Sequence, residues 1–348
     1  MAIFFDAPVS PDALITFVRR VPTPSDNALS RLFPTITSDK NTVDFAEIVQ
    51  KNRTAKYRSP DGAIHVSERD VGSEIRVPLA TLSDSLGLGE YERLQMEFAR
   101  TGGTFKERLV EAVYDDAENL TRYVLNRVEL AWGDVLADGK LTINEGNGFE
   151  GEADYGMPEN HAVAPAGAAW TNTTTAVPLT DLLAWSDVWN ATNGSRPAKF
   201  LTGLKNLRLL QKNKEIIDAV HGATQGRTRV TLTELTDLLA SEGLPTPLAP
   251  YDTQLSVDNV NTRVYPESKV SFLPENLEDL GHMRYGLTAT ALELLEAQKT
   301  EYSFSEAPGI VGVVVKGGEP AFRKHTYVDA VGQPVLTDAK KLMVAVVS

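Results

Sequence analysis

A single long amphipathic helix constrains the fold of this 348-residue chain more than any other feature. Between Thr104 and about Ala137, apolar residues recur every three or four positions, which is the period of an α-helix. Thr104 and Glu107 fit a capping box at its start, and Asp138-Gly139 predicts its end. At 1.5 Å per residue the helix would be about 50 Å long, so we expect it to cross the whole molecule. Its outward face is predicted to be acidic and to carry Glu111, Asp115, Asp116, Glu118, Glu129 and Asp134.

The chain begins with an arm that is rich in proline. Five prolines within the first 34 residues exclude a continuous helix or a central strand, although a short helix is expected at Asp12–Arg20, with Ser10 as its N-cap. The arm also carries large apolar side chains, notably Leu29, Leu32 and Phe33, which a solvated linker does not need. We therefore expect the arm to dock, either on its own chain or on a neighbouring one.

Residues 47–80 are predicted to form a long β-hairpin. The sequence Ser59-Pro60-Asp61-Gly62 favours a turn, because Pro sets φ, Asp bonds its own backbone and Gly tolerates positive φ. Apolar and polar residues alternate at 64–67 and again at 75–79, as in strands. The hairpin contains few apolar residues, and a two-stranded ribbon is marginal by itself. We therefore expect it to project from the body and to rest on a partner.

After the long helix, a strand pair is expected at 141–143 and 149–155. Residues 165–300 are typical of a separate α/β unit, and residues 301–348 return to β-structure. The expected helices cover 182–189, 204–210, 214–220 and 233–240. The expected strands cover 198–201, 254–257, 263–265, 269–273, 310–315, 321–328 and 341–347.

The residue chemistry predicts no catalytic, cofactor or metal site. The chain has no cysteine, which excludes disulfides, thiolate metal sites and a cysteine nucleophile. Its five histidines are widely separated and form no zinc-binding pattern. Residues 146–151 match GxGxxG, but no helix is predicted after them, so we interpret them as a turn. The carboxylates of residues 138–150 do not have the spacing of a calcium loop.

The net charge of −13 argues against general nucleic-acid binding, which needs a surplus of Lys and Arg. The charge is uneven: residues 81–160 carry 7 basic and 17 acidic residues, whereas residues 1–80 carry ten of each. The N-terminus has no signal-peptide pattern, and no apolar stretch is long enough to span a membrane. We expect a protein that is made and folded in the cytoplasm.

Several short segments together carry a resemblance to a known family. They are 32–43, 56–60, 270–276, 281–286 and 334–338, the last followed by 342–347. In this order along the chain they resemble the lambda-like major head protein family, the major capsid proteins of tailed bacteriophages. The resemblance implies an α+β protein with the tailed-phage capsid (Johnson) fold. Mapped onto this chain, it gives an N-terminal arm (1–45), an extended loop (46–85), a peripheral domain with the spine helix (86–165 and 301–348) and an axial domain (166–300).

The function that the resemblance implies is structural, not enzymatic. Pentamers and hexamers would form an icosahedral shell that encloses double-stranded DNA without sequence-specific binding. A scaffolding protein, a portal and, as in some relatives, a decoration protein would be partners, and the protein would lie in the virion after assembly in the host bacterial cytoplasm. No sequence motif supports covalent crosslinking of the shell. The expected subunit-interface residues are Leu29, Leu32 and Phe33 of the arm and Arg58, Pro60, Asp61, Gly62 and Arg69 of the loop.

The charge distribution adds a further expectation. The basic residues of the arm and hairpin are predicted to meet the acidic spine helix of a neighbouring subunit, which would make assembly sensitive to salt. Two alternatives stay open at this point. One is an encapsulin, a cargo shell of the same fold, and the other is a soluble α/β enzyme or binding protein centred on residues 166–300.

Overall fold

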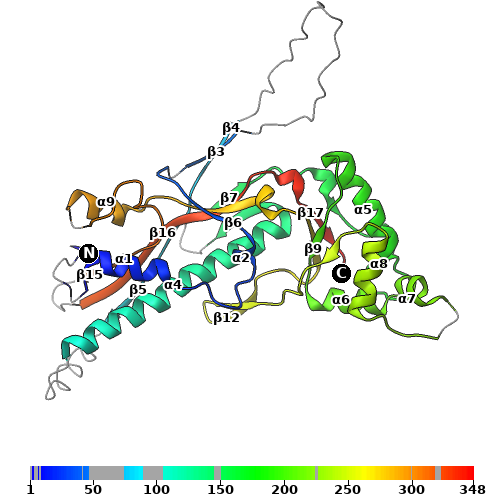
Figure 1. The fold of residues 1–348 in the computed structure, drawn as a ribbon, viewed down its shortest axis with the longest axis horizontal. Helices are drawn as coiled ribbons and strands as arrows, with labels where there is room; N and C mark the ends of the chain where they lie inside the picture. Colours follow the sequence, from blue (N-terminus) through cyan, green and yellow to red (C-terminus); the bar gives the residue numbers. More distant parts are fainter. Residues whose placement is uncertain are drawn as a thin grey trace, which may run out of the picture.

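The long helix runs through much of an elongated body in the computed structural model of this protein (Figure 1). This helix, α4, spans Phe105–Asp138, in agreement with the predicted range. Thr104, the expected capping residue, lies outside the described part of the chain. The structure describes residues 2–3, 7, 9–40, 42–46, 74–88, 105–144, 150–223, 226–298, 300–317 and 323–348.

A six-stranded sheet packs against α4 around one long strand, β16 (Arg323–Leu336). The first half of β16 pairs with β15 (Val311–Gly317) on one side and with β5 (Thr81–Leu88) on the other. Its second half pairs with β14 (Gly281–Tyr285). The outer strands are β1 (Ala2–Ile3), beside β15, and β2 (Thr35–Thr37), beside β14. Buried side chains of α4 and of this sheet form one continuous apolar core.

A five-stranded sheet forms the second part of the body. Its order is β10 (Thr246–Pro247), β9 (Lys199–Leu201), β13 (Lys269–Leu273), β17 (Met343–Val346) and β8 (Ala162–Val163). A second core of aromatic and aliphatic side chains joins this sheet to four helices. These helices are α5 (Pro178–Asn193), α6 (Leu204–Lys212), α7 (Lys214–His221) and α8 (Leu232–Ser241).

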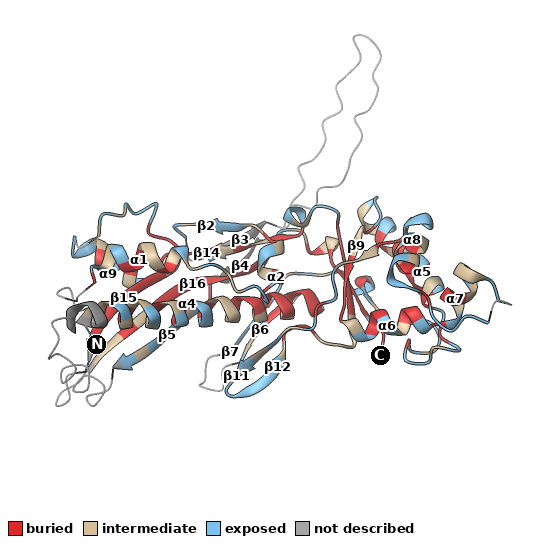
Figure 2. Cartoon of the chain, turned by 60° about the horizontal axis from the view of Figure 1, so that its bottom comes forward, coloured by how far each residue is buried: buried red, intermediate tan, exposed pale blue. Residues whose placement is uncertain are grey.

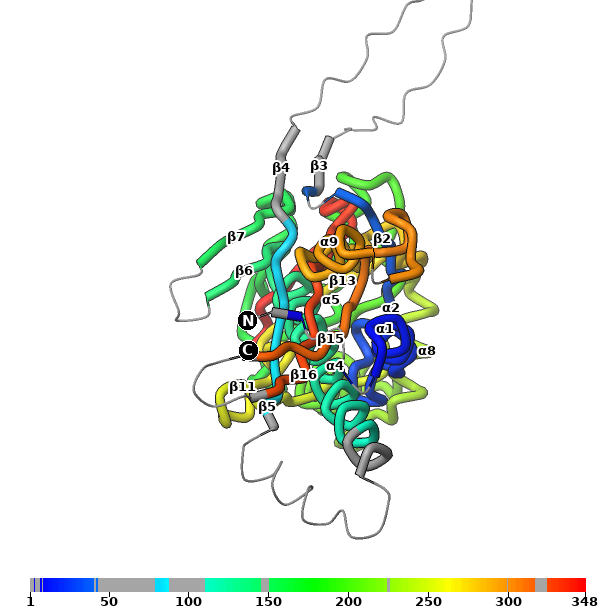
Figure 3. Tube along the Cα trace, turned by 90° about the vertical axis from the view of Figure 1, so that its left-hand side faces the viewer, coloured from blue at the N-terminus to red at the C-terminus, as the bar shows by residue number. Residues whose placement is uncertain are grey.

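Three two-stranded ladders complete the strands: β3 (Thr42–Ala46) with β4 (Glu74–Pro78), β6 (Lys140–Asn144) with β7 (Glu150–Asp154), and β11 (Gln254–Val257) with β12 (Val260–Arg263). Residues 146–149 of the GxGxxG sequence lie outside the described part of the chain, and its last two residues, Glu150 and Gly151, begin β7, so the turn there stays a prediction. The ladder of β3 and β4 leads away from the body (Figure 1). Figure 3 shows the body from one end, with α1 and α9 toward the viewer.

The remaining helices are short. They are α1 (Pro11–Arg20), α2 (Leu29–Leu32), α9 (Ala289–Glu296) and the 3-10 turns η2 (Glu159–His161), η3 (Leu277–Asp279) and η4 (Ala339–Lys341). Ser10 caps α1 as expected, because its hydroxyl accepts the backbone N–H of Ala13 at 3.3 Å. The apolar face of α1 packs on β15, where Leu14 and Val18 lie against Gly312.

Some elements differ from their predicted positions. The strand predicted at 263–265 is instead β12, because Asp258 and Asn259 take the positive φ angles of a tight hairpin turn and bring the next strand forward to Val260. The sequence analysis also missed β5, β14 and α9. The strands β5 and β14 both pair with β16, which lies far away from them in the sequence, and α9 has only eight residues.

The two sheets group the chain differently from the expected division, as β14 and β17 show. β14 lies within the range 166–300, yet it pairs with β16 in the six-stranded sheet. β17 lies within 301–348, yet it pairs with β13 in the five-stranded sheet. The chain therefore crosses between the two parts of the body several times.

In the C-terminal third of α4, Gly133 packs closely against the backbone of Val264. A Cβ atom at this position would lie 2.0 Å from the carbonyl oxygen of Val264. Alanine is the better helix former by about 1 kcal/mol, but the clash is with backbone and cannot be relieved by a rotamer change.

We therefore expect Gly133→Ala to lower the free energy of unfolding by about 1–3 kcal/mol, measured by urea denaturation. Gly167→Ala is the matched control, because no atom lies within 4 Å of a Cβ there. Equal stabilities of the two variants would contradict the close packing of α4 against the segment at Val264.

Candidate functional site

The arm docks on its own chain, and a buried carboxylate of the spine helix holds it there. Glu129 is fully buried in α4. Its Oε1 accepts the backbone N–H of Leu29 at 2.8 Å, and its Oε2 accepts that of Ser30 at 2.7 Å. The Ser30 hydroxyl also donates to Oε2. The N–H groups of Leu29 and Ser30 are the first backbone donors of α2, so Glu129 supplies the cap that α2 lacks in its own sequence.

A fourth donor reaches Glu129 from the other part of the body. The Tyr251 hydroxyl donates to Oε1 at 2.6 Å. Burial and the neighbouring Glu129 hold the pKa of Tyr251 well above its usual value, which keeps the hydroxyl protonated as a donor. Nearby, the Thr253 hydroxyl donates to the carbonyl oxygen of Asp26 at 3.0 Å. We call Glu129, Leu29, Ser30 and Tyr251 the arm junction, since it joins the arm, α4 and the segment that follows β10.

The position of Glu129 corrects the prediction that it belongs to an exposed acidic face. Asp134 also departs from that prediction, because its carboxylate accepts the backbone N–H of Thr142 at 2.7 Å and so ties α4 to β6. Burial raises the pKa of Asp134 above its usual value. Glu111 and Asp115 are exposed as predicted, and Asp116 and Glu118 are partly exposed.

Apolar contacts complete the docking of the arm. Phe33 is 4% exposed, and its ring stacks on that of Trp132 with 3.8 Å between centroids and 9° between planes. Leu29 is fully buried, and Leu32 packs against the same core. Asn27 donates to the side-chain oxygen of Asn126 at 3.0 Å.

Leu29, Leu32 and Phe33 thus lie against the core of their own chain. Their contact with a neighbouring subunit stays a prediction, and this conformation leaves Leu29 and Phe33 almost no surface for it.

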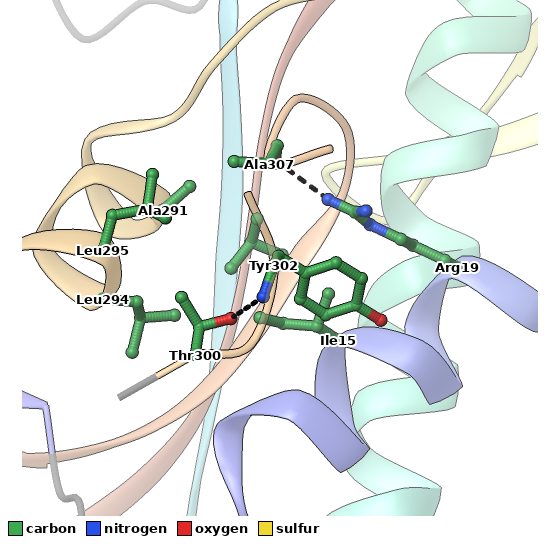
Figure 4. Close-up of a pocket in the computed structure, with 9 residues that line it drawn as sticks. Ile15, Arg19, Ala291, Leu294, Leu295, Thr300, Tyr302 and Ala307 are labelled. Carbon is green, nitrogen blue, oxygen red and sulfur yellow. Dashed lines mark hydrogen bonds between the residues drawn. The ribbon is translucent and has the colours of Figure 1, made fainter. Parts of the chain in front are cut away.

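The first helix of the arm is held by Arg19 (Figure 4). Its guanidinium donates to the carbonyl oxygens of residues 306, 307, 308 and 310 at 2.8–3.2 Å and lies over the Tyr302 ring. Arg31 similarly donates to the carbonyl oxygens of Thr23 and Pro24. These two basic residues of the arm are therefore engaged within their own chain, contrary to the expectation that the basic residues of the arm meet a neighbouring subunit.

The predicted loop residues lie outside the described part of the chain. Only the base of the hairpin is described, where β3 and β4 pair from Thr42 with Pro78 to Ala46 with Glu74. β4 lies within the predicted hairpin, but β3 lies just before residue 47, so the antiparallel pairing begins earlier in the chain than predicted. Arg58, Pro60, Asp61, Gly62 and Arg69 therefore stay predicted interface residues.

A buried histidine lies where β17, η2 and α5 meet. His161 is fully buried, its Nδ1 lies 2.8 Å from the carbonyl oxygen of Leu342, and its ring stacks on Trp189. Its Nε2 is buried and has no hydrogen-bond partner. Burial lowers the pKa of His161 below its usual value of 6.5.

The folded protein therefore takes up a proton at His161 less readily than the unfolded chain does. The resulting contribution to stability is complete above about pH 6.5 and is lost as the pH falls below it. We expect His161→Asn, whose amide can still donate to Leu342, to lose part of this dependence when the free energy of unfolding is measured between about pH 7.5 and 5.5. An unchanged pH dependence would show that His161 does not contribute.

The described ranges contain no group of three or more His, Asp or Glu side chains placed to hold a metal ion. Among the same residues, no helix has both the length and the apolar character of a membrane span.

Comparison with known proteins decides the family. The model of the family described as phage major capsid protein E matches residues 10–303. This range includes most of the arm, the spine helix, four strands of the five-stranded sheet and the strands β2, β5 and β14 of the six-stranded sheet. This chain belongs to that family. Capsid protein E is a structural protein of phage shells, so this protein is a shell-forming capsid protein and belongs in the virion. The predicted resemblance to phage head proteins is thereby confirmed.

Solved structures show the same fold at low sequence identity. One is a capsid protein assigned to a prophage of E. coli CFT073, with a TM-score of 0.62 and 13% identity, covering 98% of this chain and 99% of that one. Another is a phage-related protein of Bordetella bronchiseptica RB50, with a TM-score of 0.56 and 12% identity, covering 98% and 97%. No curated protein sequence matches this chain significantly. The predicted α+β capsid fold is confirmed.

Proposed function

We propose that this capsid protein assembles as pentamers and hexamers into an icosahedral head shell that encloses a double-stranded DNA genome. The match to capsid protein E over residues 10–303 carries the proposal. Membership of a structural family also argues against the alternative of a soluble enzyme. The match extends over both cores, so it does not single out the α/β unit as an independent domain.

The base of the hairpin supports contact between subunits. β3 and β4 pair only with each other and lead away from both cores. A two-stranded ribbon gains little stability by itself, so the hairpin needs a surface on which to rest. In a shell that surface is a neighbouring subunit, which makes the loop the principal intersubunit element in this proposal.

Charge supports the same contact. The hairpin sequence carries Lys51, Arg53, Lys56, Arg58, Arg69 and Arg76. The N-terminal half of α4 exposes Glu111 and Asp115. We infer that these opposite charges meet across the subunit boundary, in which case raising the ionic strength weakens assembly.

The proposal includes further partners. A scaffolding protein directs assembly, a portal occupies one vertex, and a decoration protein covers the shell where the phage encodes one. The DNA is enclosed without sequence-specific contacts. Assembly takes place in the cytoplasm of the bacterial host, and the mature location is the virion.

Shortening the loop tests this proposal. A variant in which a short glycine-containing turn replaces residues 48–72 keeps β3, β4 and the body intact. We expect its thermal unfolding to match that of the full chain, while shells disappear from sedimentation profiles. Shells of normal size from the shortened variant would contradict the role of the loop.

A further inference from the structure

One region of this acidic protein carries a strong positive charge. Residues 204–230, which include α6 and α7, contain six Lys and Arg residues but only two carboxylates, a net charge of +4 in a chain of −13. Neither carboxylate is available to neutralise the remaining Lys and Arg residues. Glu215 accepts the backbone N–H of Leu179 and the hydroxyl of Thr180 at the start of α5, and Asp218 pairs with Lys214.

The excess positive charge gathers on the exposed face of α6. Lys205, Arg208 and Lys212 are exposed at spacings of three and four residues, which place them on one side of the helix. The opposite side buries Leu207 and Leu210 in the second core, so the orientation of α6 is fixed (Figure 2). The sequence of α6 contains no acidic residue.

Two of the three cations on the exposed face of α6 have no acidic partner within the described residues. Lys205 pairs with Glu267 at 3.1 Å, but no ion pair is found there for Arg208 or Lys212. Arg229 joins them because its guanidinium donates to Gln211 at 2.9 Å, and the backbone N–H of Val230 donates to the Gln211 carbonyl. We call Arg208, Lys212 and Arg229 the cationic face.

We propose that the cationic face binds backbone phosphates of duplex DNA. This inference rests on the proposed function for its setting, since the DNA is that enclosed by the shell. From Lys205 to Lys212 the helix advances about 10 Å, along which duplex DNA presents about six phosphates. Lys and Arg side chains can bind phosphates without any apolar contact. Contacts to phosphates carry no sequence information.

The composition of the face favours phosphate over a protein partner. Protein interfaces are depleted in Lys and have aromatic or Met side chains at their centres. Here Leu207 and Leu210 of α6 lie in the core, and the most exposed positions on the other side are cations. Because the rest of the chain is acidic, the contact is local and weak. A weak contact can order the outermost DNA without holding it fast during packaging.

The inference is tested by measuring how random-sequence duplex DNA binds to the full-length protein. Fluorescence anisotropy measures this binding at about 50–200 mM salt. Each phosphate contact contributes about 0.9 to the slope of log K against log salt, so the double variant Arg208→Gln, Lys212→Gln should reduce the slope by about 1.8. The control Arg20→Gln, Lys40→Gln removes the same charge from two exposed positions of the arm and should leave the slope unchanged.

Two outcomes overturn the inference. In the first, both double variants change the slope equally, or the wild-type protein does not bind DNA at low salt. In the second, polyglutamate of equal charge competes for the face better than DNA, which would identify an acidic protein as the partner. Shell formation by the Arg208→Gln, Lys212→Gln variant is recorded separately by electron microscopy, so failure of DNA binding is distinguishable from failure of assembly.

Discussion

Replacing Glu129 by alanine is expected to destabilise this capsid protein by about 3 kcal/mol or more, because a buried donor left without an acceptor costs about 1–3 kcal/mol. The change removes the acceptor of four donors: the backbone N–H groups of Leu29 and Ser30 and the hydroxyls of Ser30 and Tyr251. It also leaves a cavity in α4. Chemical denaturation with two-state analysis measures the loss.

Hydrogen exchange separates release of the arm from general destabilisation. We expect the amides of Leu29 and Ser30 to exchange much faster in Glu129→Ala, even under conditions in which the rest of α4 stays protected. Glu111→Ala is the matched control, because Glu111 is an exposed carboxylate on the same helix. If both variants lose the same small amount of stability, Glu129 does not hold the arm.

Phe33→Ala is expected to lower the free energy of unfolding by about 3–5 kcal/mol, the range for large aromatic side chains in cores. The ring is almost fully buried, and it covers one face of Trp132 in α4. Its loss leaves a cavity beside a rigid helix that cannot move in to fill it. The fluorescence of Trp132, as it becomes hydrated, reports the change alongside the thermal unfolding temperature.

Phe304→Ala provides the control for this prediction. Phe304 is 52% exposed, so its truncation should change stability by no more than about 0.5 kcal/mol. A Phe33 variant as stable as the Phe304 variant would mean that the arm is not docked on Trp132 in solution. Docking on a neighbouring subunit would then become the better account of the arm.

Much of the local structure could be predicted from the sequence, because it depends on nearby residues. The period of the apolar residues in α4 and the cap at Ser10 each specify their element locally. The strands β5 and β14 could not be predicted in this way. The residues of β16 with which they pair are 47 or more positions away in the sequence, so nearby residues do not specify the pairing.

The arm junction was missed for a different reason. Helical periodicity assigns Glu129 to the outward side of α4, and carboxylates are rarely buried without a partner. Only the fold shows that the arm and Tyr251 bring donors to that side. The cationic face was hidden by averaging, because long segments mix the basic stretch around α6 with acidic neighbours. Counting charge over single helices could have found it.

The central claim is that this protein forms a closed phage-type shell. The most direct test is electron microscopy of the full-length protein, expressed alone and with a scaffolding protein. We expect icosahedral particles whose reconstruction contains both five-membered and six-membered rings of subunits. A uniform monomer under all conditions, including low salt and the presence of scaffold, would contradict the account.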